Sequence, residues 1–455
     1  MAGLACSLLC SAHLAQAQPV ELTPEQLTQA ALVALYDGDA ARALAYSEAL
    51  VGRDPQDFDA QVIRARALRD LGRYTEARDA TRLAIKAAEG ETEKFTSAVV
   101  MAQVQSSAGK KTVAQYWLRR AVEIAPSEAA KAAAIRDFKY LRATNPWSTR
   151  FTFSITPDSN VNDGSANDSS FLNYQLTELL FGQPVEYQLT GAARALPGIQ
   201  YTFGLDTRYR LTQTEFSAHD LFFKADLRQY TLTEEARRTA PGVSGDDFSF
   251  ASVFAGYGYR WLGAEKKTET ALRFDAGHSW YGGSEYANYL RGALHHAWIK
   301  SAETKFGGTL KGERQFGIRA ADIDTVSASF WGAHTLDSGH KLFWSLGAAQ
   351  ATSPFRFEEY HQWSVNGGVV LPNPILGASV QLGAGWRARD YDLSPHNRSG
   401  REDRELRGDV TFVFEDIDYH GFNPTMTLYG SFKDSNIALY ESNKVGLHFG
   451  IQSAF

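Results

Sequence analysis

The final stretch of the chain, residues 444–455, alternates between apolar side chains and polar or small ones. One set is Val445, Leu447, Phe449, Ile451 and Phe455, and the other is Lys444, Gly446, His448 and Gln452. Successive side chains of a β-strand point to opposite sides of the sheet, so the two sets lie on opposite faces. The chain is therefore expected to contain a sheet with two unlike faces, and 444–455 to be one of its strands.

The same alternation recurs from residue 185 onward. In 251–261 and 376–388 one face is apolar and carries Tyr or Trp, and the other is rich in Gly, Ser and Arg. Strands of roughly 10 to 14 residues are predicted near 185–194, 199–211, 219–230, 249–261, 269–281, 286–299, 303–315, 325–335, 340–351, 359–371, 376–389, 404–415, 424–432 and 443–455. Apolar faces with aromatic ends suit lipid, and polar faces suit a wet lumen. A soluble β-sandwich, the alternative, would have strands of about five or six residues.

We therefore predict a transmembrane antiparallel β-barrel of about 14 strands over residues 185–455. With an even number of strands, the first strand begins and the last strand ends on the same side of the membrane. With Phe455 in the periplasm, the external loops include 231–248, 316–324, 352–358, 390–403 and 433–442. The internal connections include 262–268, 336–339 and 372–375, and most are shorter. Long outer loops with short inner turns are the usual asymmetry of such barrels.

Residues 18–145 carry a helical period instead and repeat internally about every 34 residues. The repeated positions are Gly38, Ala43, Leu50 and Pro55, then Gly72, Ala77, Ala84 and Glu89, then Gly109, Ala114, Ala121 and Pro126. Small residues let paired helices approach closely, and Gly permits the turn between them. The pattern is similar to tetratricopeptide repeats, with a plain helical bundle as the alternative. The predicted fold class is α+β multidomain, with helical repeats before the barrel.

Residues 1–17 are expected to be a secretory signal peptide. Leu4 to Leu14 is apolar, and Ala15-Gln16-Ala17 has the small-x-small pattern of a cleavage site. Cys6 and Cys10, the two cysteines of the sequence, both fall in this segment. Cleavage would leave a mature chain without disulfides, thiolate metal sites or a cysteine nucleophile.

Residues 146–184 lie between the two regions. Pro146 ends the helical pattern, Phe151, Phe153 and Ile155 alternate, and a turn-forming run of Asp, Ser and Asn follows Pro157. We expect a linker or a plug segment near the periplasmic mouth of the barrel. If the strand count is wrong by one hairpin, 151–155 is instead the first strand.

Together these features resemble one group, the surface lipoprotein assembly modulator (Slam) family and related tetratricopeptide-containing outer-membrane proteins. The most specific part is the motif Pro157-Asp158-Ser159-Asn160-Val161-Asn162, which follows a junction containing Trp147. The resemblance implies an outer-membrane barrel with its repeats in the periplasm, and delivery of a cognate surface lipoprotein or secreted protein across the outer membrane. It also implies that Asp158, Ser159, Asn160 and Asn162 serve in a plug or a cargo contact.

The chain end carries a second resemblance. Phe449 and Phe455 resemble the C-terminal signal that outer-membrane barrels present to the barrel assembly machinery. The expected partners are therefore the cargo protein, outer-membrane lipid and that machinery. A net charge of -6 leaves no strong nucleic-acid footprint.

No arrangement of residues predicts an enzyme, a cofactor or a metal site. The sequence lacks a phosphate-binding Gly-x-x-x-x-Gly-Lys loop and a Gly-x-Ser-x-Gly elbow. His295 and His296 are adjacent and would face opposite sides of a strand. Two other functions remain open. One is an exopolysaccharide export porin, although such proteins usually have longer repeat arrays. The other is a barrel-embedded lipid hydrolase, for which no Ser–His pair can be placed.

Charged side chains are expected to line the lumen. Lys224, Asp226 and Arg228 alternate with apolar neighbours. Arg387 and Arg389 share a face with Asp409 or Glu415 of the next strand if the register permits. Such charges either keep the inner wall hydrated or form a track for cargo.

Overall fold

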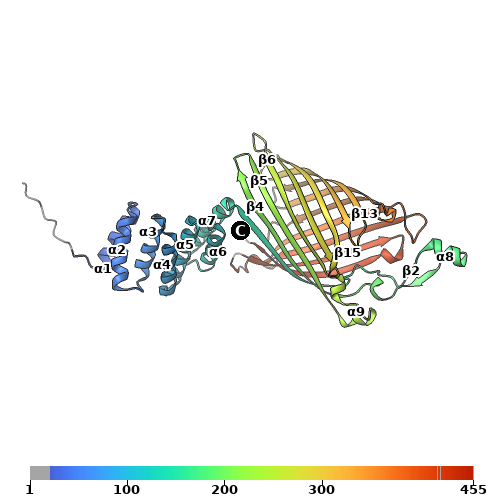
Figure 1. The fold of residues 1–455 in the computed structure, drawn as a ribbon, viewed down its shortest axis with the longest axis horizontal. Helices are drawn as coiled ribbons and strands as arrows, with labels where there is room; N and C mark the ends of the chain where they lie inside the picture. Colours follow the sequence, from blue (N-terminus) through green and yellow to red (C-terminus); the bar gives the residue numbers. More distant parts are fainter. Residues whose placement is uncertain (1–20, 418, 421, 454–455) are drawn as a thin grey trace, which may run out of the picture. The chain divides into compact units, whose positions relative to one another are not determined.

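The computed structural model describes residues 21–417, 419–420 and 422–453, so the predicted signal peptide and Phe455 lie outside the described residues. The chain divides between Ala143 and Thr144 into a helical unit and a β-barrel unit, both drawn in Figure 1. The predicted fold class is confirmed, because helical repeats precede a closed antiparallel barrel of 14 strands.

Seven helices make up the described part of the first unit. They are α1 (Pro24–Tyr36), α2 (Ala40–Arg53), α3 (Phe58–Asp70), α4 (Tyr74–Ala87), α5 (Glu91–Ser107), α6 (Lys111–Glu123) and α7 (Glu128–Thr144). None of the helices in the described ranges is both long and apolar enough to pass through a membrane.

The repeat prediction rests on small residues, and the structure shows why they are needed. Gly38, Gly72 and Gly109 follow α1, α3 and α5 with φ of 78°, 76° and 76°. A residue with a Cβ is strained in that left-handed region, so the turn favours Gly. Ala43 and Ala77 are both 0 % exposed and let neighbouring helices pack closely.

The barrel wall consists of antiparallel strands, each paired with the next along the chain. They are β1 (Trp147–Asp158), β4 (Gly198–Gln213), β5 (Ser217–Leu232), β6 (Phe250–Leu262), β7 (Thr268–Tyr281), β8 (Ser284–Ile299), β9 (Thr304–Gly317), β10 (Ile323–Thr335), β11 (Lys341–Thr352), β12 (Tyr360–Val370), β13 (Ser379–Tyr391), β14 (Arg401–Val413), β15 (Phe422–Ser435) and β16 (Ser442–Ser453). β1 pairs with both β4 and β16 and so closes the ring.

The prediction for the first strand is wrong. Residues 146–184 were expected to lie outside the wall, but β1, which falls in this range, is a wall strand. Residues 185–194 were expected to form the first wall strand, but they are not part of the wall. Within that stretch, β3 (Glu186–Gln188) pairs with β2 (Ser169–Phe171) in a separate two-stranded sheet, and a single 3-10 turn follows. The total of 14 holds because one strand was missed and one was wrongly added.

The connections separate into two groups, as predicted, because alternate hairpins lie at opposite ends of an antiparallel barrel. The loops after β5, β9, β11, β13 and β15 share one end, which we call the long-loop end. The turns after β6, β10 and β12 share the other, the short-turn end, where β1 also begins. Residues 159–197 connect β1 to β4 and therefore lie at the long-loop end, not at the short-turn mouth where a plug was expected.

The two faces of the wall differ as the alternation predicts. On the outer face, Phe151, Val326 and Trp363 are 74, 66 and 60 % exposed, which suits contact with hydrocarbon. The inner face carries mostly polar, charged and Gly residues. The predicted opposite placement of His295 and His296 is confirmed, since His295 stacks on inward-facing Trp331 and His296 contacts Trp298 on the outer face.

Candidate functional site: the motif at the long-loop end and the inner wall

Asp158, the first of the four candidate site residues, ends β1 on the inner face and is 6 % exposed. Its carboxylate accepts a hydrogen bond from the Tyr429 hydroxyl of β15, and Lys444 Nζ of β16 lies 3.5 Å away. The same carboxylate accepts the Asn160 backbone N–H at 2.8 Å. Asp158 therefore joins β1 to both strands that follow it around the ring.

Ser159 and Asn160 complete the turn that leaves β1. Ser159 N donates to the Val445 carbonyl at 3.1 Å, and Ser159 Oγ accepts from Val445 N at 3.0 Å. Asn160 is 0 % exposed, and its side-chain amide donates to the Gly164 carbonyl and accepts the Gly164 N–H, both at 2.9 Å. These bonds satisfy buried backbone groups where the ladder stops.

Asn162 anchors the return of the chain to β4. Its side-chain amide donates to the Ala192 and Arg194 carbonyls at 2.9 Å, and its carbonyl accepts the Leu196 N–H at 2.8 Å. The structure thus places all four motif residues in one turn, with their side chains bonded within the chain. The role of Asp158, Ser159, Asn160 and Asn162 in a plug or a cargo contact stays a prediction.

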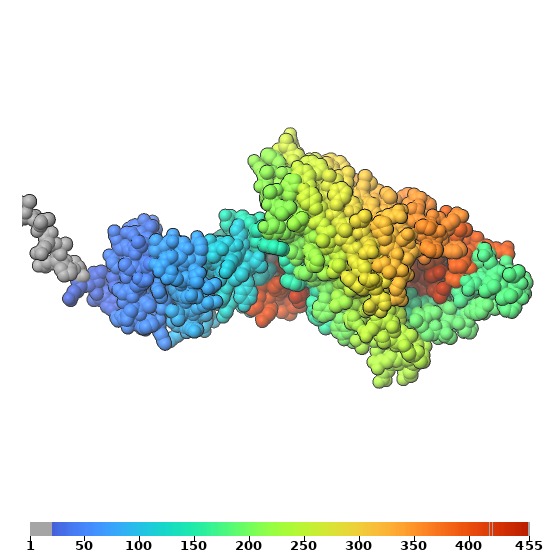
Figure 2. All heavy atoms as spheres, in the orientation of Figure 1, coloured from blue at the N-terminus to red at the C-terminus, as the bar shows by residue number. Residues whose placement is uncertain are grey.

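The rest of segment 159–197 contacts three loops at the long-loop end. Val161 and Leu196 pack with Leu232 and with the short helix α9 (Glu234–Thr239). Ser165 Oγ donates to the Ala438 carbonyl at 2.7 Å. In Figure 2 the green spheres of this segment form a lobe beside the orange and red spheres of the last strands.

Helix α8 (Tyr174–Phe181) of this lobe is held by the loop between β13 and β14. Asn173 N donates to His396 Nδ1 at 3.1 Å, and Arg398 forms an ion pair with Glu178. Burial, and secondarily the charge of Arg401, lower the pKa of His396 and so favour the neutral ring that accepts this bond. A groove of about 670 Å³ lies between α8 and the loops.

Charged side chains line the inner face, as predicted, and the strand register identifies them. The basic ones are Arg150, Arg208, Arg210, Lys224, Arg228, Arg260, Arg273, Arg291, Lys305, Lys311, Lys341, Arg387, Arg389, Arg401, Arg407, Lys433 and Lys444. The acidic ones are Asp158, Asp206, Asp220, Asp226, Glu269, Asp275, Glu313, Asp403, Glu405 and Asp409. Basic side chains outnumber acidic ones on this face, although the whole chain has a net charge of -6.

Arg387 and Arg389 share the inner face with Asp409, but the register brings them opposite other carboxylates. Arg387 lies opposite Glu405 and Arg389 opposite Asp403, whereas Asp409 lies opposite Gly383. Glu415 lies beyond the end of β14. The sequence placed these residues on the correct face, but only the register decides which of them meet.

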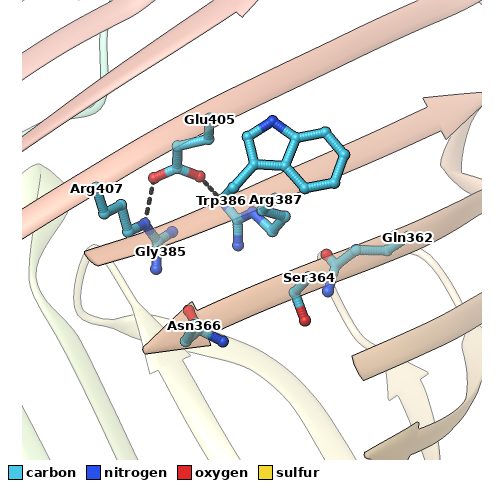
Figure 3. A pocket seen from close by; sticks show the side chains of 8 residues that line it. All are labelled: Gln362, Ser364, Asn366, Gly385, Trp386, Arg387, Glu405 and Arg407. Atoms are coloured by element: carbon cyan, nitrogen blue, oxygen red, sulfur yellow. Dashed lines mark hydrogen bonds and ion pairs between the residues drawn. The ribbon is translucent and has the colours of Figure 1, made fainter. Parts of the chain in front are cut away.

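Glu405 lies at the centre of a charged cluster on β13 and β14. Figure 3 shows its carboxylate between Arg387 and Arg407, and it forms ion pairs with both. Gln362, Ser364 and Asn366 of β12 line the same cavity, whose volume is about 190 Å³. The arrangement offers hydrogen-bond donors and positive charge, and contains no nucleophile activated by a neighbouring base.

Two residues of the motif network carried no direct sequence signal. Alternation places Tyr429 and Lys444 on the inner face, but only the β15–β16 and β16–β1 registers bring them to Asp158.

In the part of the chain that the structure describes, no group of three or more His, Cys, Asp or Glu side chains could hold a metal ion.

Comparisons with solved structures find distant likenesses to both units. The first tetratricopeptide domain of human RPAP3 is 16 % identical, with 27 % of this chain and 94 % of that chain covered and a TM-score of 0.24. The Yersinia enterocolitica type III secretion translocator chaperone SycD is 20 % identical, with 26 and 89 % covered and a TM-score of 0.24. A bacterial polysaccharide outer membrane secretin is 8 % identical, with 67 and 98 % covered and a TM-score of 0.34. No curated protein matches the chain.

A family comparison is more informative. The sequence profile of a family described as "Surface lipoprotein assembly modifier" matches residues 147–453. This span is more than half of the chain, and it begins with β1 and ends with β16, so it covers the entire wall. The chain therefore belongs to the surface lipoprotein assembly modifier family, and its family and fold together indicate an outer-membrane transport barrel with a role in lipoprotein assembly.

Proposed function

We propose that the protein is a translocator that delivers a cognate surface lipoprotein or secreted protein across the outer membrane. The observation that carries the proposal is the family match over a closed wall with an apolar outer face and a charged inner face. A hydrated inner wall suits the passage of polar chain, and an apolar outer wall suits lipid. No covalent chemistry is required of the chain for this role.

The helical unit is proposed to act in the periplasm, where it would meet cargo first. The chain enters the barrel through Trp147, at the short-turn end. In outer-membrane barrels the short turns are periplasmic and the long loops external, which supports this orientation. Stacked helical repeats commonly offer extended surfaces for peptides or domains.

Three further roles follow from this orientation. Outer-membrane lipid would contact the outer face, and the barrel assembly machinery would read Phe449 and Phe455 at the chain end. The motif turn, with Asp158, Ser159, Asn160 and Asn162, would lie at the external mouth. There it would hold segment 159–197 in place, and cargo leaving the lumen would meet that segment.

The test is deletion of the gene, followed by protease shaving of intact cells and mass spectrometry of released surface peptides. We expect one lipoprotein or secreted protein to disappear from the surface or medium while remaining present inside the cell. Complementation with the full chain should restore it. Unchanged surface exposure of all lipoproteins and secreted proteins would contradict the proposal.

A matched pair of complementing variants separates transport from folding. Phe151 and Thr152 are neighbours on β1 that face outward and inward respectively. Thr152→Ala should restore cargo display, because the wall keeps its polar interior. Phe151→Asp puts a charge against hydrocarbon and should lower the amount of barrel in the membrane.

Loss of exopolysaccharide with intact protein display in the deletion strain would instead favour polysaccharide export.

A further inference from the structure

The excess of positive charge on the inner wall is concentrated where β13, β14 and β15 approach the long-loop end. Asp403 and Glu405 are the carboxylates of this region, and each side chain is 9 % exposed. Arg401 donates to Asp403 at 2.9 and 2.6 Å. Arg387 and Arg407 both pair with Glu405. The two carboxylates are therefore already engaged by three arginines.

Two further cations of this cluster have no carboxylate partner among the described residues. Arg389 donates to the neutral Gln362 side chain at 3.0 and 2.7 Å, and to the Tyr391 hydroxyl at 3.2 Å. Lys433 lies opposite Glu405 on β15, and its side-chain ammonium makes no hydrogen bond or ion pair within the described ranges. A cavity of about 60 Å³ is lined by both residues together with Arg387, Arg401 and the two carboxylates, Asp403 and Glu405.

Such a cluster is costly for a half-buried wall unless something compensates for it. Like charges held close together repel, and removing a cation from bulk water without a partner is unfavourable. Elsewhere on the inner face single lysines are paired, as Lys224 is with Asp226 at 3.1 Å and Lys311 with Glu313 at 2.9 Å. Arg228, Lys305 and Lys341 of the inner face also have no ion pair among the described residues, but their side chains are exposed to water. Arg389 and Lys433 differ from them because they are half-buried and lie in one cluster.

We propose that this cluster, the β13–β15 basic site, binds carboxylates of an acidic polypeptide segment in extended conformation. The proposal rests on the translocator function and names the chemical class of cargo segment that the lumen would hold. Arg387 and Arg389 lie two residues apart on one strand, so their positions repeat roughly every 6.7 Å. Alternate side chains of an extended peptide repeat at the same interval, so acidic residues at every second position would match them.

The layout favours a polypeptide over a phosphate group. A phosphate is best held by donors that converge on one point. Here the cations follow the strands and have separate partners. Arg389 donates to Gln362, and Arg401 donates to Asp403 and lies 3.4 Å from the centroid of the Tyr440 ring. Several carboxylates spaced along a peptide can pair with more of these cations at once than a single phosphate dianion can.

The experiment measures binding of a fluorescein-labelled decaglutamate peptide to the purified full chain in detergent micelles, by fluorescence anisotropy at low salt. The test variant is Arg389→Gln with Lys433→Gln, and the matched control is Lys311→Gln, which removes a lumenal lysine that already has a partner. Folding of each variant is checked by heat-modifiable migration on SDS gels. Arg389→Lys is a second variant that keeps the charge.

We expect the double variant to bind decaglutamate about tenfold more weakly, and the Lys311→Gln and Arg389→Lys variants to change binding less than about twofold. Binding by the wild-type chain should fall steeply with added salt. Absence of binding, or equal loss in the double variant and the Lys311→Gln control, would overturn the proposal. So would displacement of the peptide by inorganic phosphate or by phosphatidylglycerol micelles at the same concentration of negative charge.

This outcome is separable from that of the proposed function. Peptide binding is measured on purified protein and needs no cargo delivery. If decaglutamate binds as expected while the deletion strain displays all its surface proteins, the basic site stands and the translocator proposal fails. If cargo display is lost on deletion but decaglutamate does not bind, the translocator proposal stands and the basic site is wrong.

Discussion

Strand β1 has two neighbours, and it is held to them in different ways. With β4 it forms an unbroken ladder in which every residue from Trp147 to Asp158 has a partner. With β16 the described ladder has two pairs, Ile155 with Phe449 and Asp158 with Gly446. The same strand therefore has one long backbone-bonded edge and one short one.

Side chains supply much of what the β1–β16 edge lacks in backbone pairing. Thr156 Oγ1 lies 3.1 Å from His448 Nδ1, and the carboxylate of Asp158 joins Tyr429 and Lys444. Backbone ladders tolerate most substitutions, but side-chain bonds depend on particular residues. We therefore expect barrel closure to depend on a few side chains in and next to the motif turn, and the wall to open at this edge at the lowest cost in free energy.

The largest effect is expected at Asp158. Asp158→Ala removes the acceptor for the Tyr429 hydroxyl and for the Asn160 N–H. Lys444 loses one of its two carboxylate partners and keeps the other, Asp163, at 3.0 Å. We expect the free energy of unfolding to fall by about 2–3 kcal/mol. Urea titration of the barrel refolded into lipid vesicles measures it.

The control lies on the same strand but on its well-paired edge. Thr152→Ala, on the inner face and opposite Gly204 of β4, should change stability by about 0.5 kcal/mol or less. Equal losses from the two substitutions would show that the β1–β16 edge is no more dependent on side chains than the β1–β4 edge.

A smaller effect is expected at Asn160, which acts within the turn and not across the edge. Asn160→Ala leaves the N–H and C=O of Gly164 without their partner. We predict a loss of about 1–2 kcal/mol in the same urea titration. Asn160→Asp keeps the acceptor for the Gly164 N–H and should recover part of the loss. A variant as stable as the wild-type chain would refute the role of this residue in ordering the turn.

The smallest effect concerns the lobe, whose contact with the β13–β14 loop depends on pH. Burial lowers the pKa of His396 below its ordinary value of 6.5. Between that lowered pKa and pH 6.5, the unfolded state therefore binds more protons than the folded state. The contact with Asn173 N is therefore fully present above pH 6.5 and is lost as the pH falls toward the lowered value.

Limited proteolysis within 174–181 tests this pH dependence. We expect cleavage about two- to fivefold faster at pH near 5.5 than at pH near 7.5, after correction for the protease's own pH profile. His396→Asn removes the titrating group and should abolish the difference. The same ratio in wild-type and variant chains would show that another group controls the lobe.

Much of the barrel could be predicted from sequence because alternation is a local property. The faces of 251–261 and 376–388 follow directly from a period of two, and the helical repeats follow from the small residues at Gly38, Gly72 and Gly109. Alternation does not say which sheet a strand joins. Residues 186–188 look like the start of a wall strand but pair with β2, whereas β1 was hidden by the turn-forming residues that follow it.

The candidate site was less accessible to sequence reasoning for the same reason. The motif Asp158 to Asn162 could be recognised, but its partners Tyr429 and Lys444 are far away in sequence and are reached only through the closed ring. Similarly, the basic site depends on Arg389 facing Gln362 and on Lys433 facing Glu405 without an ion pair. Non-local register decides both, and no local pattern encodes it.

The most direct test of the account is disulfide cross-linking across the proposed closure, in a chain whose Cys6 and Cys10 are replaced by Ser. Ile155→Cys with Phe449→Cys puts two cysteines on directly opposed residues, within the reach of a disulfide. The competing closure through 185–194 is tested by Leu189→Cys with Phe449→Cys. We expect rapid cross-linking of the 155–449 pair in isolated outer membranes and none of the 189–449 pair. The reverse result would contradict closure of the barrel through β1.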